Sequence, residues 1–220
     1  METAKAHARR VREGFFEKYV QAPVIDIGCG RVTGPTGSAH GIDPLTPDAL
    51  CWDQDDGDAT FMRPEELRRH QQWTPAMQDG FGTVYSSHCI EHIQNPLLAI
   101  KNWWRIVRPG GHLIVYAPSR DHYEKRKELP SRWNADHKFF LTLDTEELPF
   151  TISLKALVAA ALQSDCNWTG FEDAFASCKL KIPYRSPWAY RECTEGHTIT
   201  DPDIHSDGEY SLEVVVKKIA

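Results

Sequence analysis

The stretch YSSHCIEHI, residues 85–93, places two histidines and a glutamate within five consecutive positions, as His88, Glu91 and His92. Imidazole nitrogens and carboxylate oxygens bind transition metals, and histidine also acts as a general acid or base. In a helix, the spacing i, i+3, i+4 would bring the three side chains to one face. The stretch therefore predicts either a metal site or a polar pocket at the start of a helix.

A second group of candidate residues lies downstream, in the segment SRWNADHKFFLT of residues 131–142. Arg132 can bind a phosphate or carboxylate through two parallel hydrogen bonds, and the Trp133 ring can stack on a sugar. His137 is a further candidate base or ligand. The run EKRKE of residues 124–128 is instead expected to form a solvated, charged helix.

The chain has 220 residues, which suits a single domain over residues 1–220. Its net charge of −6 argues against nucleic-acid binding, which needs a basic face. No apolar run has the length of a membrane helix, and residues 1–16 lack the apolar core of a signal peptide. The six cysteines form no C-x-x-C pair, which predicts reduced thiols and a cytoplasmic location.

Apolar patterning predicts alternating strands and helices, and hence an α/β domain with a largely parallel sheet. A basic amphipathic helix is expected over residues 3–19, with residues 1–20 as an N-terminal helical segment. A second helix runs from Leu97 and ends at Pro109-Gly110-Gly111, and a third lies within residues 145–164. The expected strands span residues 24–27, 38–43, 49–54, 81–87, 112–118 and 211–219.

The first expected strand opens into a glycine-rich loop, VIDIGCGRVTG, that only partly fits a dinucleotide fingerprint. Gly28 and Gly30 match G-x-G-x-x-G, but the third glycine is replaced by Thr33. Asp26 precedes the loop and Asp43 follows the next expected strand. A pyrophosphate prefers helix amides without adjacent carboxylates, whereas a ribose diol, an ammonium and a sulfonium suit carboxylates. The pattern therefore disfavours a nicotinamide oxidoreductase.

Five segments in order resemble the motifs of class I S-adenosylmethionine-dependent methyltransferases. They are VIDIGCG, HGIDP, DGDAT, FGTVYSSHCIEH and RIVRPGGHLIVYAP, which together cover residues 24–117. The resemblance implies a Rossmann-like, seven-stranded, mostly parallel sheet with an antiparallel last strand. S-adenosyl-L-methionine would bind at the carboxyl edge of that sheet.

The resemblance also assigns roles by position. Asp26, Gly28, Gly30 and Ser87 would lie at the methionine end of the cofactor, Asp43 would bind the ribose hydroxyls, and Asp58 and Ala59 would border the adenine. One departure is that only thirteen residues separate Gly28 from Ile42. The helix that the family has there must be short or absent, because Gly34, Pro35 and Gly37 lie inside it.

The order H-x-x-E-H also occurs in zinc proteases, but methyltransferase motifs flank it on both sides here, so we set that interpretation aside. Two alternatives stay open for His88, Glu91, His92 and His137. They form a polar pocket, or they bind a divalent transition metal. His137 resembles a histidine of metal-dependent 2′-O-methyltransferases, although those enzymes have glutamate at the position of His88. Several imidazoles favour Mn, Fe, Co, Ni or Zn over Mg.

The resemblance further implies that residues 118–142 and 182–210 wall the acceptor site, with Arg132 and Trp133 as substrate contacts. The second segment could instead form an oligomer contact, for example in a homodimer. The combined motifs are similar to small stand-alone bacterial methyltransferases, some of them linked to glycan biosynthesis. These features predict a small-molecule acceptor such as a sugar, with no nucleic-acid or membrane partner.

We therefore expect an O-methyltransferase in which His137 or His92 removes the acceptor proton. N-methylation of a small metabolite is the alternative within the same class, because a neutral amine needs less help from a base. A non-catalytic module that only binds the cofactor is the alternative outside that class.

Overall fold

The computed structural model describes residues 2–29, 49–52, 58–62, 64–163, 184–185, 190–193 and 209–219. The helices are α1 (Glu2–Arg12), α2 (Phe15–Tyr19), α3 (Pro64–Leu67), α4 (Pro96–Ile106) and α5 (Leu154–Gln163). Short turns of helix are η1 (Ala59–Phe61), η2 (Pro75–Met77), η3 (Ile90–His92) and η4 (Arg120–Glu124). The strands are β1 (Val24–Ile27), β2 (Leu50–Trp52), β3 (Phe81–Ser87), β4 (Val107–Pro118), β5 (Phe140–Thr142), β6 (Thr151–Ser153), β7 (Tyr184–Arg185), β8 (Tyr190–Cys193) and β9 (Ser211–Lys218).

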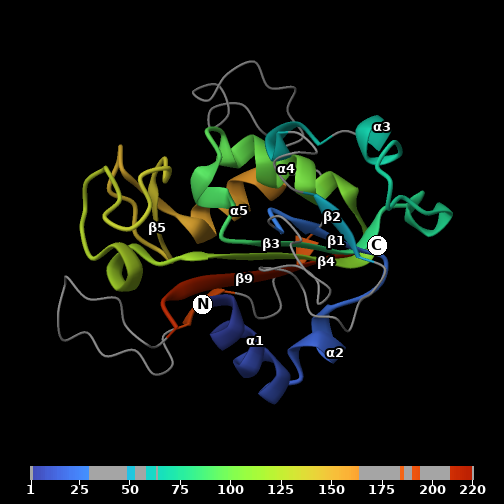
Figure 1. The fold of residues 1–220 in the computed structure, drawn as a ribbon, viewed down its shortest axis with the longest axis horizontal. Helices are drawn as coiled ribbons and strands as arrows, with labels where there is room; N and C mark the ends of the chain where they lie inside the picture. Colours follow the sequence, from blue (N-terminus) through green and yellow to red (C-terminus); the bar gives the residue numbers. More distant parts are fainter. Residues whose placement is uncertain are drawn as a thin grey trace.

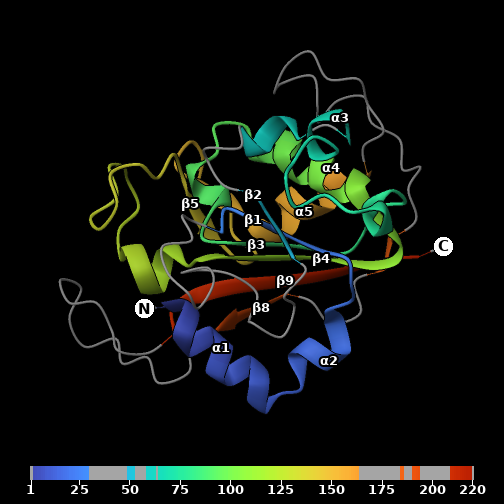
Figure 2. The ribbon, with the colours of Figure 1, turned by 45° about the vertical axis from the view of Figure 1, so that its right-hand side comes forward.

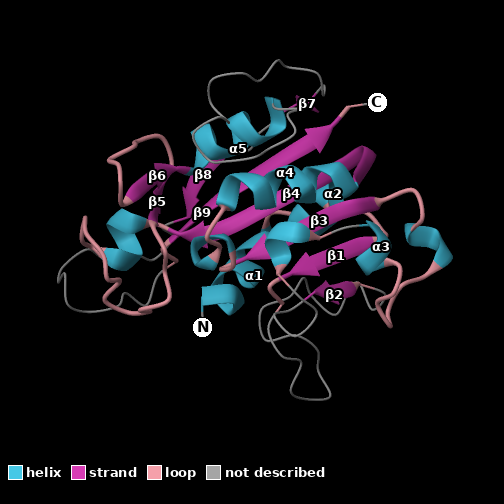
Figure 3. Cartoon of the chain, turned by 90° about the horizontal axis from the view of Figure 1, so that it is seen from above, coloured by secondary structure: helices cyan, strands magenta, loops and turns pink. Residues whose placement is uncertain are grey.

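Within the described residues the main sheet has seven strands, and its central part follows the order β2-β1-β3-β4-β9. Strands β2, β1, β3 and β4 are parallel, whereas β9 runs antiparallel to β4 and also pairs with β7 and β8. Figure 3 shows these strands side by side beneath α4 and α5. The predicted Rossmann-like methyltransferase fold, with its antiparallel last strand, is confirmed. Strands β5 and β6 form a separate two-stranded parallel sheet.

Helices cover both faces of the main sheet (Figures 1 and 2). Helices α4 and α5 lie on one face and α1 and α2 on the other. The apolar residues of α4 fall at helical spacing, so Leu97, Ile100 and Trp104 point together into the larger core. A smaller cluster joins Phe15 and Tyr19 of α2 to the opposite face of β3, β4 and β9.

The N-terminal segment forms two helices rather than the one helix predicted for residues 3–19. The break is at Gly14, whose φ of 61° is left-handed and ends the helical run. Two basic residues of the predicted amphipathic helix, Arg9 and Arg10, are buried. Arg9 Nε lies 2.9 Å from Glu209 Oε2 and Arg10 Nε lies 2.8 Å from Glu213 Oε2, so charge pairing docks α1 on the sheet.

The structure bears out most of the predicted elements within its described residues and shifts several of their boundaries, such as the start of β4, which is Val107 rather than residue 112. Strands β1 and β3 have the predicted bounds, and β9 ends one residue early. Helix α4 ends at Ile106, so Pro109-Gly110-Gly111 lies inside β4 and does not terminate the helix. The strand predicted for residues 38–43 lies outside the described residues. Across the described part of the chain, no helix combines the length and apolar character of a membrane span.

His112 on β4 is a buried histidine outside the candidate site. Its pKa is a measure of how α2 packs on the sheet. Its ring contacts the Tyr19 ring edge-on at 5.7 Å between centroids, and its strand partner is Lys217. Burial, with Lys217 as a smaller cause, lowers the pKa of His112 from 6.5 to about 4.

We predict that His112 makes the folded state less stable as the pH falls from 6.5 toward 4. In that window the unfolded chain binds a proton that the folded chain does not, so stability changes by up to about 1.4 kcal/mol per pH unit. Thermal melts of wild type and His112→Gln across this range should show a weaker pH dependence in the variant. An identical dependence in both proteins would contradict this account.

Candidate functional site

Three of the predicted cofactor residues lie at the carboxyl ends of the adjacent parallel strands β1 and β3. Asp26 is buried within β1, Gly28 follows that strand, and Ser87 ends β3. The register pairs Ile27 with Ser86, so these strand ends are neighbours. The Ser87 hydroxyl is buried and makes no hydrogen bond within the described part of the chain. A polar ligand at this edge would satisfy it, which fits S-adenosyl-L-methionine.

Gly28 is held close to the segment that carries the histidines. Its φ is +77°, its N–H donates to Trp52 O at 2.8 Å, and a Cβ at this position would lie 2.5 Å from Cys89 Cβ. A side chain at residue 28 is therefore excluded by both the backbone conformation and the neighbouring chain. The glycine loop and residue 89 are in direct contact, so the two predicted motifs adjoin. Gly30 and Asp43 lie outside the described residues.

Asp58 and Ala59 form a fixed segment beside α4. Asp58 Oδ1 accepts a hydrogen bond from the Thr60 N–H at 2.8 Å and caps η1, while Ala59 O accepts from the Trp103 indole N–H at 2.9 Å. Asp58 itself is exposed. The cap gives Asp58 a structural role, and its predicted contact with adenine stays a prediction.

The structure corrects the prediction of reduced thiols at two positions, because Cys29 and Cys51 form a disulfide. Asp26 is the register partner of Cys51, and the chain then turns after β1 so that the Cα atoms of Cys29 and Cys51 are 5.9 Å apart. This separation is ordinary for a disulfide. The 22-residue spacing along the chain gave no sign of this proximity.

The two histidines and the glutamate after β3 do not share one helix face, which corrects the predicted helix start. His88 has a left-handed backbone with φ of 51°, and residues 90–92 form the single turn η3. Helix α4 begins only at Pro96, with Asn95 accepting from the Leu98 N–H as its cap. The side chains converge because the chain bends sharply at residue 88.

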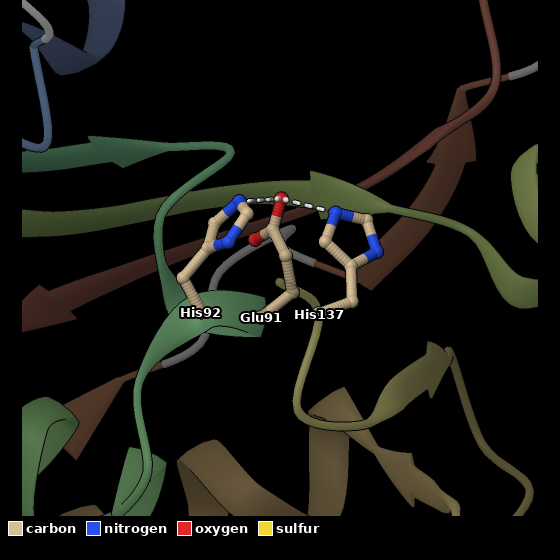
Figure 4. A group of neighbouring side chains, drawn as sticks. All are labelled: Glu91, His92 and His137. Atoms are coloured by element: carbon tan, nitrogen blue, oxygen red, sulfur yellow. Dashed lines mark ion pairs between the residues drawn. The ribbon is translucent and has the colours of Figure 1, made fainter. Parts of the chain in front are cut away.

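Glu91 is the centre of the cluster (Figure 4). Its side chain is buried, and the imidazole rings of His92 and His137 are turned toward it. Glu91 Oε1 lies 3.9 Å from His92 Nε2 and 4.0 Å from His137 Nε2. The Lys138 N–H donates to Glu91 O at 2.9 Å, which holds the segment carrying His137 against η3.

Glu91, His92 and His137 each offer one ligand atom, and these atoms lie within 4.8 Å of one another. His88 is not part of this group. Its Nδ1 lies 3.6 Å from Glu91 Oε1, but its ring packs edge-on against Tyr116 and its Nε2 lies 3.5 Å from Ser211 Oγ. The structure thus brings together three of the four predicted ligands and places the fourth beside the carboxylate.

Two further carboxylates, besides Glu91, contact the Nδ1 atoms of the two imidazole rings. His92 Nδ1 lies 3.0 Å from Asp136 Oδ2, and His137 Nδ1 lies 2.5 Å from Glu124 Oε1. Both rings therefore use Nδ1 for a carboxylate and present Nε2 to Glu91. Carboxylates commonly orient metal-bound histidines in this way.

Glu124 was missed at the sequence level, where it belonged to a run expected to be solvated. It is instead 1% exposed, at the end of the turn η4. Nothing in the spacing of the run EKRKE separates Glu124 from its charged neighbours. A π-type turn of five residues orients it inward, and such turns have no simple sequence signature.

The Glu91 carboxyl is ionised at neutral pH. Burial alone would raise its pKa, but the imidazoles of His88, His92 and His137 outweigh burial and hold the pKa below its ordinary value. A buried, ionised carboxylate beside two imidazole nitrogens is suited to bind a cation or to stabilise an imidazolium.

The predicted substrate residues lie on the loop beside this cluster. Trp133 is half-buried, and its indole N–H donates to Tyr123 O at 2.8 Å. Arg132 is exposed. Most of the predicted acceptor segment 182–210 lies outside the described residues, whereas residues 118–142 are all described.

A family model for a methyltransferase domain matches residues 3–148. The fold is similar to a possible histamine N-methyltransferase from Thermotoga maritima, with 16% identity, a TM-score of 0.46, and 99% of this chain and 87% of that chain covered. It is also similar to the N-methyltransferase NodS from Bradyrhizobium japonicum, with 12% identity, a TM-score of 0.46, and 100% and 97% covered. No curated protein sequence matches the chain.

We predict that Gly28→Ala destabilises the protein more than Gly110→Ala. Both glycines have positive φ, but a Cβ at residue 110 meets nothing within 4 Å, whereas one at residue 28 meets Cys89. The shared backbone strain costs about 1–2 kcal/mol, and overpacking adds roughly 1–3 kcal/mol at residue 28. Urea unfolding of both variants measures the difference, and equal losses would show that the contact with Cys89 can relax.

Proposed function

Because the chain belongs to the methyltransferase domain family, we propose that this S-adenosylmethionine-dependent methyltransferase methylates a hydroxyl oxygen of a small polyhydroxylated molecule. The bound cofactor supplies an electrophilic methyl group on its sulfonium. The proposal concerns the acceptor, the position of the base and the assistance of a metal.

The observation that carries the proposal is the buried Glu91 carboxylate with the Nε2 atoms of His92 and His137 about it. A hydroxyl must lose its proton as it attacks, whereas a neutral amine attacks without a base. Two imidazoles and an ionised carboxylate near the acceptor therefore favour methylation of a hydroxyl oxygen over methylation of an amine nitrogen. N-methylation remains the alternative that experiment must separate.

The strand ends that would bind the cofactor and the cluster around Glu91 are joined by residues 87–92. Ser87 ends β3 at the cofactor edge, and Glu91 follows after the bend at His88. An acceptor hydroxyl held near Glu91 would therefore lie next to the methionine end of the cofactor, as in-line attack requires. The oxygen–carbon bond would form as the carbon–sulfur bond of the cofactor broke, and the acceptor proton would pass to an imidazole. When no metal is bound, we assign that role to His137 Nε2, because Glu124 occupies Nδ1. An Nε2 atom that binds an ion has no lone pair left to accept the proton.

The donor set also fits a divalent transition metal. Glu91, His92 and His137 would bind it, and Asp136 and Glu124 would orient the two imidazoles. Two nitrogens and one carboxylate favour Mn, Fe, Co, Ni or Zn over Mg. Such an ion would lower the pKa of a bound hydroxyl and fix its position.

The acceptor class is inferred from the aromatic side chains beside His137. Tyr123 packs against His137 with ring centroids 5.8 Å apart and against Tyr210 at 4.9 Å, and Trp133 lies on the same loop. Aromatic rings of this kind stack on sugars. The net charge of −6 supports a small-molecule acceptor rather than a nucleic acid. A homodimer stays a proposal.

We predict that the purified enzyme retains a transition metal and that His92→Ala loses it. Removing one of three protein ligands weakens the site, while cofactor binding persists because Gly28 and Ser87 lie outside it. Elemental analysis of wild type, His92→Ala and the control His70→Ala should show metal in the first and third only. Chelation should abolish methylation of a polyol and a transition metal should restore it.

Full activity of the metal-free wild type would remove the metal and leave general-base catalysis by His137. Methyl transfer to amines but not to hydroxyls, in a screen of both with the same enzyme, would exclude O-methylation. His137→Ala tests both roles together. It should slow turnover in either case, and full activity of this variant would remove both roles.

We also predict that Asp43→Ala weakens cofactor binding roughly 10- to 100-fold. The resemblance assigns Asp43 to the ribose hydroxyls, and hydrogen bonds to a charged group contribute about 1.5–3 kcal/mol. Calorimetric titration with S-adenosylmethionine and its demethylated product measures the loss, with the exposed Asp79→Ala as control. Unchanged affinity in folded Asp43→Ala would place the ribose elsewhere.

A further inference from the structure

We propose that Glu124 is a positioning residue that holds His137 in the tautomer with hydrogen on Nδ1, so that the Nε2 lone pair faces Glu91. This inference deepens the proposed function, on which its catalytic consequence rests. Neither the family match nor the sequence motifs assign a role to Glu124.

The contact between Glu124 and His137 is short and shielded from solvent. Glu124 Oε1 lies 2.5 Å from His137 Nδ1, and the side chains of the two residues are 2% and 3% exposed. A carboxylate in contact with a ring nitrogen accepts its hydrogen, and the ring's other nitrogen is then the acceptor. The Nε2 atom is the one that lies 4.0 Å from Glu91 Oε1.

The loop fixes the carboxylate as well as the ring. Glu124 Oε2 accepts a hydrogen bond from Ser131 Oγ at 2.7 Å, so both carboxylate oxygens are engaged. Ser131 Oγ in turn accepts from the backbone N–H groups of Trp133 and Asn134 at 3.3 and 3.1 Å. Glu124 can therefore rotate only if the turn at residues 131–134 opens.

The burial of Glu124 is hard to explain by stability alone. Taking a carboxylate out of water is costly unless a strong partner compensates. Within the described residues its recorded partners are Ser131 and His137, and neither is a lysine or arginine. The backbone also departs from regular geometry to place it, since η4 is a π-type turn followed by Lys125 at φ 52°. Such turns recur at functional sites.

The pair Asp136 and His92 provides an internal comparison. Asp136 lies 3.0 Å from His92 Nδ1, yet its side chain is 64% exposed and also lies 2.7 Å from Lys138 Nζ. Water and Lys138 compete for this carboxylate, so its hold on the ring is weaker. The same contact thus occurs once buried and once exposed at a single site.

The test compares Glu124→Gln with Asp136→Asn, both of which remove charge and keep shape, and with the surface control Asp144→Asn. Zn²⁺ or Mn²⁺ titration followed by calorimetry should show affinity 10- to 100-fold lower in Glu124→Gln, the usual loss when a carboxylate that orients a ligand is removed. Asp136→Asn should lose roughly 3-fold or less, because an exposed pair contributes little. Asp144→Asn should match the wild type.

A readout independent of metal and of methyl transfer is the tautomer of His137. Long-range proton–nitrogen NMR spectra of histidine-labelled protein at mildly alkaline pH distinguish hydrogen on Nδ1 from hydrogen on Nε2. Wild type should show the Nδ1–H form at His137, and Glu124→Gln should populate the other form, because the glutamine amide can donate to Nδ1. An unchanged His137 tautomer in folded Glu124→Gln would overturn the proposal.

Ser131→Ala keeps the proposal falsifiable if Glu124→Gln does not fold. It frees one carboxylate oxygen without touching His137, and should shift the tautomer and metal affinity in the same direction by a smaller factor. If Ser131→Ala and Glu124→Gln both behave as wild type, Glu124 has no positioning role. If wild type shows the Nδ1–H form and responds to Glu124→Gln but methylates no hydroxyl, the proposed acceptor fails and the positioning role stands.

Discussion

The site depends on one constraint, which is that the Glu91 carboxylate is buried and ionised in the turn η3 that follows β3. A charge in that position requires neighbours that can share it, and the fold supplies imidazoles from two directions, His88 and His92 along the chain and His137 from the loop after β4. The bend at His88 and the backbone hydrogen bond from Lys138 N–H to Glu91 O bring these imidazoles to the carboxylate. The strand ends that would bind the cofactor and the cluster around Glu91 are therefore only a few residues apart along the chain. A change in packing at one of them is expected to affect the chemistry at the other.

The fold was largely predictable because its signals are local. The short apolar run of residues 24–27 predicts a strand buried on both faces. The apolar spacing along α4 predicts a helix with one buried face. The break at Gly14 was less visible, since glycine within a helical pattern is often tolerated. The inward face of α1 was hidden for a different reason. Arg9 and Arg10 are buried only because Glu209 and Glu213 lie opposite them, and those partners are remote in sequence.

The candidate site was predictable in its residue types and less so in its geometry. Glu91 and His92 were identified from their spacing with His88, and His137 from the resemblance to metal-dependent 2′-O-methyltransferases. The prediction of a common helix face was wrong, because spacing alone cannot distinguish a helix from a bent turn that brings the same residues together. Glu124 and the disulfide between Cys29 and Cys51 depend on contacts across neighbouring elements. No local pattern records such contacts, since they arise only when the sheet has formed.

The ion pairs of Arg9 have a consequence for the order in which the protein folds. Arg9 and Glu209 are 200 residues apart, so this ion pair cannot form until the chain has been synthesised as far as residue 209. Contacts between residues so far apart in sequence carry a large loop-closure entropy, so we expect the pairing of α1 with the segment that leads into β9 to form late in folding.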